Sequence, residues 1–364
     1  MEMEVESKFE LVTSNLAEVI GDINVLKKIL AIRPLKLYWG TAPTGRIHIG
    51  YFAAMNKLVD YQRAGCDLTI LLADRHAIFD NEKSTREQIP FRTEIYRQVI
   101  EKMFEIVGGD ASKLTWVVGS QFQRTEEYDD IMTELKTKVS IHDCIKAGAE
   151  VVKQTEHPNM ASVEYPIMQV ADEVYLDVDA QAGGLDQRKI MILGRTMRSK
   201  ITAKKGPLAK YKKREMFHLM NKMIPSLSTK SLEDLGGSYK KMSASDGSKI
   251  DVLDGKKIIK KKLATAFCKP GVIDDNTPLF LLRDIFFPIL HRINTTFKVT
   301  RKEEYGGDIE FETFSEVQEA FEKEKLHPDD LKNSMVVMIS SLLEPIRNLE
   351  EKKDFRDLLK KAYK

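Results

Sequence analysis

The sequence predicts a Rossmann-like α/β fold, a doubly wound parallel sheet followed by a C-terminal domain that is mostly helical. Three short apolar runs, at residues 36–40, 67–73 and 114–118, are separated by stretches with helical periodicity. Strands that alternate with amphipathic helices in this way are typical of parallel sheets with crossover helices. After about residue 252 the pattern changes to successive amphipathic helices, which indicates the second domain.

The first long helix can be placed from the residues at its ends. A capping box at Ser84 and Glu87 predicts its start, and two glycines after Ile106 predict its end. In a doubly wound sheet, ligands bind at the carboxyl ends of the strands, where the strand order reverses. The loop after the first strand is therefore where we expect a binding site.

A second helix carries a row of polar side chains. Pro166 suits its first turn, and Tyr165, Gln169 and Asp172 follow at a spacing that puts them on one face. Apolar residues cover much of the remaining circumference. The polar face would therefore either line a cavity or, as in an ordinary surface helix, meet solvent.

The composition indicates a globular chain. Its 364 residues, 42% of them hydrophobic, suffice for two or three packed units. Apolar stretches such as residues 68–73 are far shorter than the roughly 20 residues that cross a bilayer, so we expect no transmembrane helix. The first ten residues are acidic and lack the apolar core of a signal peptide, so we expect a cytoplasmic protein.

The positions of the cysteines and of the charged residues indicate whether to expect a metal site or a nucleic-acid-binding surface. Cys66, Cys144 and Cys268 lie far apart and form no zinc-binding cluster, so we expect no structural metal. The net charge of +2 does not indicate nucleic-acid binding, but residues 195–214 carry nine Lys or Arg and no acid. That segment is either a solvated face or a surface for a polyanion.

Two motifs nearly 200 residues apart are suited to binding a nucleotide. The first strand leads into a Gly-, Pro- and Thr-rich turn that delivers His48 and Gly50 to a helix start, where backbone amides favour phosphates. The second motif, KMSAS at 241–245, lies in a Gly- and Ser-rich stretch. Lys241, Ser243 and Ser245 could close over a triphosphate and stabilise charge that develops on the leaving pyrophosphate.

HIGY at 48–51 and KMSAS resemble the HIGH and KMSKS signatures of class I aminoacyl-tRNA synthetases. Tyr51 and Ala244 depart from those signatures. Similar variants occur in archaeal and eukaryotic tyrosyl and tryptophanyl enzymes. They leave more of the binding and charge stabilisation of the phosphates to His48 and Lys241. The resemblance implies that the residues with catalytic roles are His48, Lys241, Ser243 and Ser245.

A further resemblance points to the tyrosyl-tRNA synthetases of archaeal and eukaryotic type. The pattern YPxxQxxD at 165–172, followed by GGxDQRK at 183–189, is similar to their tyrosine-binding helix and the strand and loop after it. This resemblance implies that the tyrosine-binding residues are Tyr38, Tyr165, Gln169, Asp172 and Gln187. In it, Tyr38 and Asp172 would bind the phenolic hydroxyl. The residues implied for ATP are Gly40, His48, Gly50, Gly184, Asp186 and Lys241.

The same resemblance implies contacts with tRNA. Arg188 and Lys189 would face the acceptor end, and the basic segment would meet the tRNA backbone. In the helical domain, Tyr305 could stack on an anticodon base, with Asp330 accepting from a guanine and His327 nearby. Asp330 is equally well explained as an acid at a helix N-terminus.

The implied function is tyrosine–tRNA ligation, with ATP and Mg²⁺, tyrosine and tRNA(Tyr) as substrates and partners, and a homodimer as the assembly. We divide the chain into an N-terminal helical segment (1–30), a Rossmann-like catalytic domain with an acceptor-stem-facing insertion (31–240), a KMSKS-type loop (241–252) and an anticodon-binding domain (253–364). The alternatives are a tryptophanyl-tRNA synthetase, a small-molecule adenylyltransferase and a non-catalytic RNA-binding paralogue. Asp172 favours tyrosine, since a tryptophan enzyme has little use for a buried carboxylate there.

Overall fold

The structure, a computed structural model, describes residues 3–80, 84–152, 156–227, 241–242, 247, 249–274 and 276–363. Within these ranges the main sheet consists of β1 (Leu16–Ile20), β2 (Lys36–Thr41), β3 (Asp67–Leu72), β4 (Thr115–Val118), β5 (Ala180–Gly184) and β6 (Phe217–Asn221). The strand order is β1-β6-β5-β2-β3-β4, with every neighbouring pair parallel except β1 and β6. The predicted doubly wound α/β sheet is confirmed.

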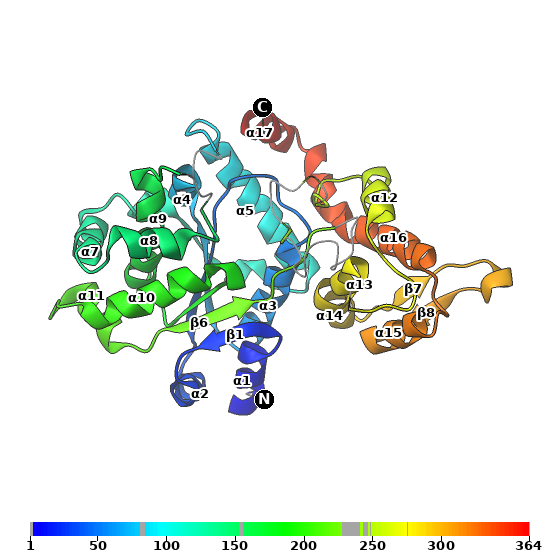
Figure 1. The fold of residues 1–364 in the computed structure, drawn as a ribbon, viewed down its shortest axis with the longest axis horizontal. Helices are drawn as coiled ribbons and strands as arrows, with labels where there is room; N and C mark the ends of the chain where they lie inside the picture. Colours follow the sequence, from blue (N-terminus) through cyan, green and yellow to red (C-terminus); the bar gives the residue numbers. More distant parts are fainter. Residues whose placement is uncertain are drawn as a thin grey trace.

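Helices cover both faces of this sheet, so the strands are buried on two sides (Figure 1). One face is covered by α1 (Val5–Thr13), α2 (Ile23–Ile32), α3 (Tyr51–Arg63) and α5 (Ile89–Ile106). The other is covered by α4 (Asp74–Phe79), α6 (Gly119–Phe122), α7 (Glu126–Lys136), α8 (Ile141–Gly148), α9 (Met160–Tyr175), α10 (Arg188–Lys200) and α11 (Gly206–Lys213). Along β2, Leu37 and Trp39 enter the first core and Tyr38 the second. This alternation, normal for a strand, points Tyr38 toward the α9 side.

The order of the strands fixes the position of the site. From β2 the chain proceeds outward through β3 and β4, then returns to β5 and β6 on the other side of β2. The strand order therefore reverses between β2 and β5, and their carboxyl ends border one crevice. Those ends carry Gly40 and Gly184, for which the family resemblance implies contacts with ATP.

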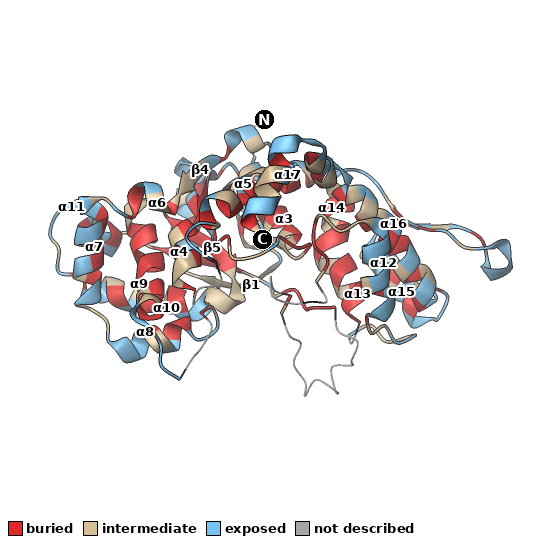
Figure 2. Cartoon of the chain, turned by 90° about the horizontal axis from the view of Figure 1, so that it is seen from above, coloured by how far each residue is buried: buried red, intermediate tan, exposed pale blue. Residues whose placement is uncertain are grey.

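The second domain packs directly against the first. It contains α12 (Lys256–Thr265), α13 (Thr277–Leu281), a π-helical segment (Leu282–Phe286), α14 (Phe287–Arg292), α15 (Phe314–Glu322), α16 (Pro328–Arg347) and α17 (Lys353–Ala362), with a hairpin of β7 (Phe297–Val299) and β8 (Ile309–Phe311). Its buried side chains form one core with those of α3 and α5, and Figure 2 shows buried segments in both domains. The Asn56 amide donates to the Ile285 carbonyl across the boundary at 2.9 Å. None of the described helices has the length and apolarity to cross a bilayer.

Two predicted helix starts are wrong. The long helix α5 begins at Ile89, and the reciprocal contacts expected of Ser84 and Glu87 lie between Thr85 and Gln88, at 3.3 and 3.5 Å. Ser84 is buried and instead accepts from the Arg92 guanidinium at 2.6 Å. The hydrogen bond from Arg92 therefore replaces the helix-capping role that the sequence predicted for Ser84.

The polar helix also begins earlier than the proline predicted. Asn159 caps α9, accepting from the Ser162 amide at 2.8 Å, so Pro166 lies in the helix interior. The predicted N-terminal helical segment, 1–30, also contains strand β1, which lies between α1 and α2 in the chain and pairs with β6 at the sheet edge.

Candidate functional site

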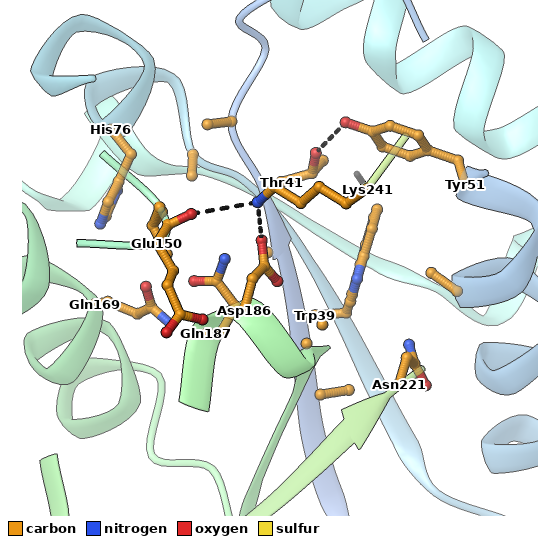
Figure 3. A pocket seen from close by; sticks show the side chains of 18 of the residues that line it. Trp39, Thr41, Tyr51, His76, Glu150, Gln169, Asp186, Gln187, Asn221 and Lys241 are labelled. Atoms are coloured by element: carbon orange, nitrogen blue, oxygen red, sulfur yellow. Dashed lines mark hydrogen bonds and ion pairs between the residues drawn. The ribbon is translucent and has the colours of Figure 1, made fainter. Parts of the chain in front are cut away.

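A cavity of about 760 Å³ opens at the carboxyl ends of β2 and β5. It is lined by all of the described residues that the sequence assigned to catalysis, tyrosine or ATP: Tyr38, Gly40, His48, Gly50, Tyr165, Gln169, Asp172, Gly184, Asp186, Gln187 and Lys241. Ser243 and Ser245 lie outside the described residues. Elements far apart in the chain thus meet at the switch point, and Figure 3 shows several of their side chains around the cavity.

Asp172 forms the deep polar end of the cavity. Only 1% of the residue is exposed. Its Oδ1 accepts from the Gln123 amide at 2.8 Å and from the Tyr128 hydroxyl at 2.9 Å. Tyr38 lies at the same end, fully buried, with its hydroxyl 3.5 Å from the Gln169 carbonyl oxygen. The carboxylate is therefore held in place through one oxygen by two donors.

Burial changes the protonation of this end of the site. It raises the pKa of Asp172 to about 7, although the bonds from Gln123 and Tyr128 oppose the rise. Burial also lowers the pKa of His76 to about 3, with a smaller contribution from the Arg75 charge. His76 Nε2 lies 3.8 Å from Asp172 Oδ2, and a neutral imidazole makes this a polar contact without an ion pair.

The His76 ring also borders the expected tyrosine site. It packs edge-on against Tyr165, with ring centroids 4.7 Å apart. Neither ring nitrogen has a hydrogen-bond partner among the described residues. The Gln181 side chain on β5 likewise lines the cavity, and its oxygen lacks a partner within the described part of the chain. Both side chains present polar atoms that a bound ligand can satisfy.

A second buried carboxylate, Glu173, follows Asp172 directly and points elsewhere. It accepts from the Tyr211 hydroxyl at 2.5 Å and contacts His218 Nε2 at 3.0 Å. Consecutive residues of an α-helix project about 100° apart, so only one of the two reaches the cavity. Glu173 thereby ties α9 to α11 and β6.

The mouth of the cavity carries an ion pair between two predicted nucleotide residues. Lys241 Nζ lies 2.6 Å from Asp186 Oδ2 and donates to the Glu150 carbonyl at 3.3 Å (Figure 3). Asp186 lies in a 3₁₀ turn, Leu185–Gln187, directly after β5. The ammonium group is thus within reach of anything that binds at the strand end.

The segment that follows the KMSAS motif pairs through its backbone with the residues around His48. The Ile49 amide donates to the Ile250 carbonyl at 3.0 Å, and the Val252 amide donates to the Ile47 carbonyl at 3.1 Å. Gly50 is needed beside them, because a Cβ there would lie 2.9 Å from His48 Nδ1. The segment after the KMSAS motif is therefore anchored beside the start of α3.

Tyr51, which departs from the HIGH pattern, has a packing role. Its hydroxyl lies 3.2 Å from Thr41 Oγ1, and its ring packs edge-on against His48 with centroids 5.1 Å apart. It therefore connects the end of β2 to the start of α3.

Sequence reasoning missed Gln123 and Tyr128, which hold Asp172. Gln123 follows the short turn after β4, so the rule that ligands gather at the ends of strands could have drawn attention to it. Tyr128, in the first turn of α7, reads as an ordinary core aromatic, and its sequence context gives no signal.

The residues predicted to contact tRNA form two groups. Arg188 pairs with Glu18 at 2.6 Å and Lys189 with Glu150 at 2.7 Å, both at the start of α10 beside the cavity. The other group is in the helical domain. Tyr305 is 64% exposed in the β7–β8 loop, which projects from the far end of the molecule in Figure 1.

The other two residues of that group lie at the start of α16. The His327 ring caps the helix by accepting from the Asp329 amide at 3.2 Å, and Asp330 lies in the first turn.

The basic segment, residues 195–214, contains arginines held in ion pairs and lysines that are exposed. Arg195 and Arg198 pair with Glu215 at 3.2 and 3.3 Å, and Arg214 pairs with Asp177 at 2.6 Å. The exposed lysines are Lys200, Lys204, Lys205, Lys210, Lys212 and Lys213. A polyanion would therefore meet the lysines of the α10–α11 region.

Proteins with similar sequences belong to the family whose motifs line the cavity. The family described as tRNA synthetases class I (W and Y) matches residues 31–344. A cytoplasmic tyrosine–tRNA ligase of Saccharomyces cerevisiae is 42% identical, over 98% of this chain and 87% of the relative. The corresponding protein of Danio rerio is 43% identical, but this chain spans only 63% of its length. A tyrosine–tRNA ligase of Haloarcula marismortui is 36% identical over 98% of its length.

Solved structures that resemble this fold come from the same family as these relatives. Tyrosyl-tRNA synthetase of Pyrococcus horikoshii, complexed with L-tyrosine, matches with a TM-score of 0.84 at 27% identity, over 98% of this chain and all of that one. The Archaeoglobus fulgidus enzyme, also complexed with L-tyrosine, gives a TM-score of 0.79 at 29% identity, over 95% of this chain and 99% of that one. The chain therefore belongs to the tyrosine–tRNA ligases, within the class I tRNA synthetases.

Proposed function

We propose that this chain activates tyrosine with ATP and transfers the tyrosyl group to the 3′ end of tRNA(Tyr). The observation that carries the proposal is the buried Asp172 carboxylate at the end of the cavity, held by Gln123 and Tyr128. The relatives' names and the tyrosine bound in the archaeal structures support it. Location in the cytoplasm follows the names of the relatives, and a homodimer remains our prediction.

Asp172 accounts for the choice of substrate. One of its oxygens already accepts two hydrogen bonds. The other oxygen, Oδ2, would accept a hydrogen bond from the phenol of tyrosine. Phenylalanine would displace water from this end without supplying a donor. Leaving a buried acceptor unpaired costs about 1–3 kcal/mol, and more when it is charged. Tyr38, which lines the same cavity, would contact the same hydroxyl.

The remaining tyrosine-binding residues would hold the other end of the amino acid. Tyr165 and Gln169 lie on the same face of α9 as Asp172, and Gln187 enters the cavity from the turn after β5. We assign these three to the ammonium group. The carboxylate of tyrosine would then face the nucleotide at the strand ends.

The chemistry requires alignment and charge stabilisation. The tyrosine carboxylate attacks the α-phosphate of ATP, giving tyrosyl-adenylate and pyrophosphate, and the terminal ribose hydroxyl of the tRNA then takes the tyrosyl group. No protein nucleophile takes part. Mg²⁺ bound with ATP would supply charge neutralisation for the phosphates. Gly40, Gly50, Gly184 and Asp186 would contact the nucleotide at the strand ends.

The groups that stabilise the departing pyrophosphate would be His48, Lys241 and the serines Ser243 and Ser245. Lys241 is held beside Asp186 at 2.6 Å. Exchanging the Asp186 carboxylate for phosphate oxygens would bring the ammonium group onto the developing charge.

The substrate assignment predicts a specific amino-acid dependence of ATP–pyrophosphate exchange. Tyrosine should drive exchange, whereas tryptophan and phenylalanine should be slower by at least about tenfold, since each lacks the phenol that pairs with Asp172. Exchange driven by tryptophan and not by tyrosine would identify a tryptophanyl enzyme. Exchange with no amino acid would overturn the ligase assignment.

Tyrosine affinity should depend on pH through Asp172. Burial raises the pKa of this carboxyl to about 7, and the ionised form is the stronger acceptor for the neutral phenol. Affinity should therefore be highest above that pKa and fall as the pH is lowered, by up to about tenfold per pH unit. His76, with its pKa lowered to about 3, stays neutral throughout.

Calorimetric titration with tyrosine between about pH 6 and pH 8 measures this dependence. Asp172→Asn is the control, because it keeps the shape and removes the ionisation. Its affinity should be weaker and flat across the range. A wild-type affinity that rises as the pH falls would have the wrong sign for this account.

The anticodon assignment predicts a difference between two neighbouring acids. Asp330→Ala should raise the KM for tRNA about tenfold in aminoacylation, the effect of losing one charge-assisted base contact, and leave tyrosine-dependent exchange unchanged. Asp329→Ala is the matched control, since Asp329 lies in the same first turn of α16. Equal effects of the two variants would show that Asp330 serves only as a helix N-terminal acid.

A further inference from the structure

The segment from Thr41 to Gly50 connects β2 to α3 and forms one wall of the cavity. Gly45, in its middle, lines the cavity. Glycine has the greatest backbone freedom of any residue, so a well-defined wall needs restraint from outside the segment. In this chain the restraint comes partly from the far end of the sequence.

Tyr363, which follows the last residue of α17, reaches this wall. Its hydroxyl donates to the Gly45 carbonyl oxygen at 3.0 Å, and the Tyr96 hydroxyl of α5 donates to the same oxygen at 2.8 Å. A carbonyl oxygen has two lone pairs, so two phenols fill its capacity as an acceptor. Because the peptide is planar and trans, holding this carbonyl also fixes the direction of the next N–H, that of Arg46.

The Tyr363 ring is held by two guanidinium groups. Arg46, from the wall itself, lies 5.0 Å from the ring centroid, and Arg92 of α5 lies 5.2 Å from it. Guanidinium groups within about 6 Å of an aromatic centroid are attracted to the ring. The ring is therefore in contact with the wall as well as with α5.

Arg92 joins the end of α17 to the same wall. It is buried, and its Nε donates to the Ala362 carbonyl at 2.9 Å while its Nη1 donates to the Thr44 carbonyl at 2.6 Å. The helix itself is fixed through the fully buried side chains of Phe355 and Ala362. Figure 1 shows α17 beside α5, beyond the end of α16.

We propose that Tyr363 is a positioning residue for ATP. It acts as a clamp: its hydroxyl holds the Gly45 carbonyl, which fixes residues 44–46 of this wall and so orders the phosphate end of the site. The proposal rests on the proposed function for the identity of the nucleotide. Tyr363 need not touch the substrate, since it acts through the backbone that leads to His48. Asp172 and the tyrosine end of the cavity make no contact with this clamp among the interactions of the described residues.

The clamp predicts a selective loss of ATP affinity. In Tyr363→Phe the ring stays between the two guanidinium groups and only the bond to Gly45 is lost, so the Kd for ATP should rise about threefold to tenfold. Tyr363→Ala also removes the ring and should raise it further. Lys360→Ala is the matched control, because Lys360 lies on the same helix with its side chain exposed and paired with Asp357.

Calorimetric titration of the full chain with ATP, and separately with tyrosine, measures both affinities, and thermal unfolding of each variant accompanies them. The expected result is weakened ATP binding in both Tyr363 variants, with tyrosine affinity and unfolding temperature unchanged in Tyr363→Phe. Unchanged ATP affinity in both variants would overturn the clamp. So would an equal loss of both affinities together with a lowered unfolding temperature, which would indicate a purely structural role.

Tyrosine-dependent exchange by the wild-type chain keeps the two proposals separate. Normal exchange in the wild type with unchanged ATP affinity in the Tyr363 variants would overturn the clamp and leave the proposed function standing. Absence of tyrosine-dependent exchange, combined with the selective loss of ATP affinity, would overturn the proposed function and support the clamp.

Discussion

The hydrogen bonds from Gln123 and Tyr128 to Asp172 are the interaction on which the rest of the site depends. A carboxylate that is 1% exposed is costly to keep charged, and burial raises its pKa to about 7 even with both donors present. Without them, the group would be protonated or would turn away from the cavity. With them, one side of the carboxylate is fixed and the other can receive a phenol.

The fold supplies these donors from different elements. Asp172 lies on α9, which is buried along most of its length, while Gln123 and Tyr128 come from the segment after β4. Glu173 anchors a second side of α9 through Tyr211 and His218. The helix is therefore held on two sides, and its polar row faces the cavity. At the other end of the cavity, backbone pairing and the α17 contacts order the wall that leads to α3.

Much of this arrangement was predictable from the sequence. Apolar runs placed β2, β3 and β4, and the spacing of Tyr165, Gln169 and Asp172 put them on one face of a helix. The structure brings the described residues predicted for tyrosine and ATP to one cavity, which the motif resemblance had implied. What the sequence could not show depends on tertiary contacts. Nothing in the sequence around Tyr128 indicates that it binds Asp172. The start of α5 differs from the prediction because Ser84 accepts a hydrogen bond from the buried Arg92 guanidinium.

The most direct test of the account is the ratio of kcat/KM for tyrosine to that for phenylalanine in pyrophosphate exchange, compared between the wild type and Asp172→Asn. Losing the charged acceptor should lower this ratio by at least about tenfold, mainly through slower use of tyrosine. A ratio unchanged in the variant would contradict the claim that the buried carboxylate selects the phenol.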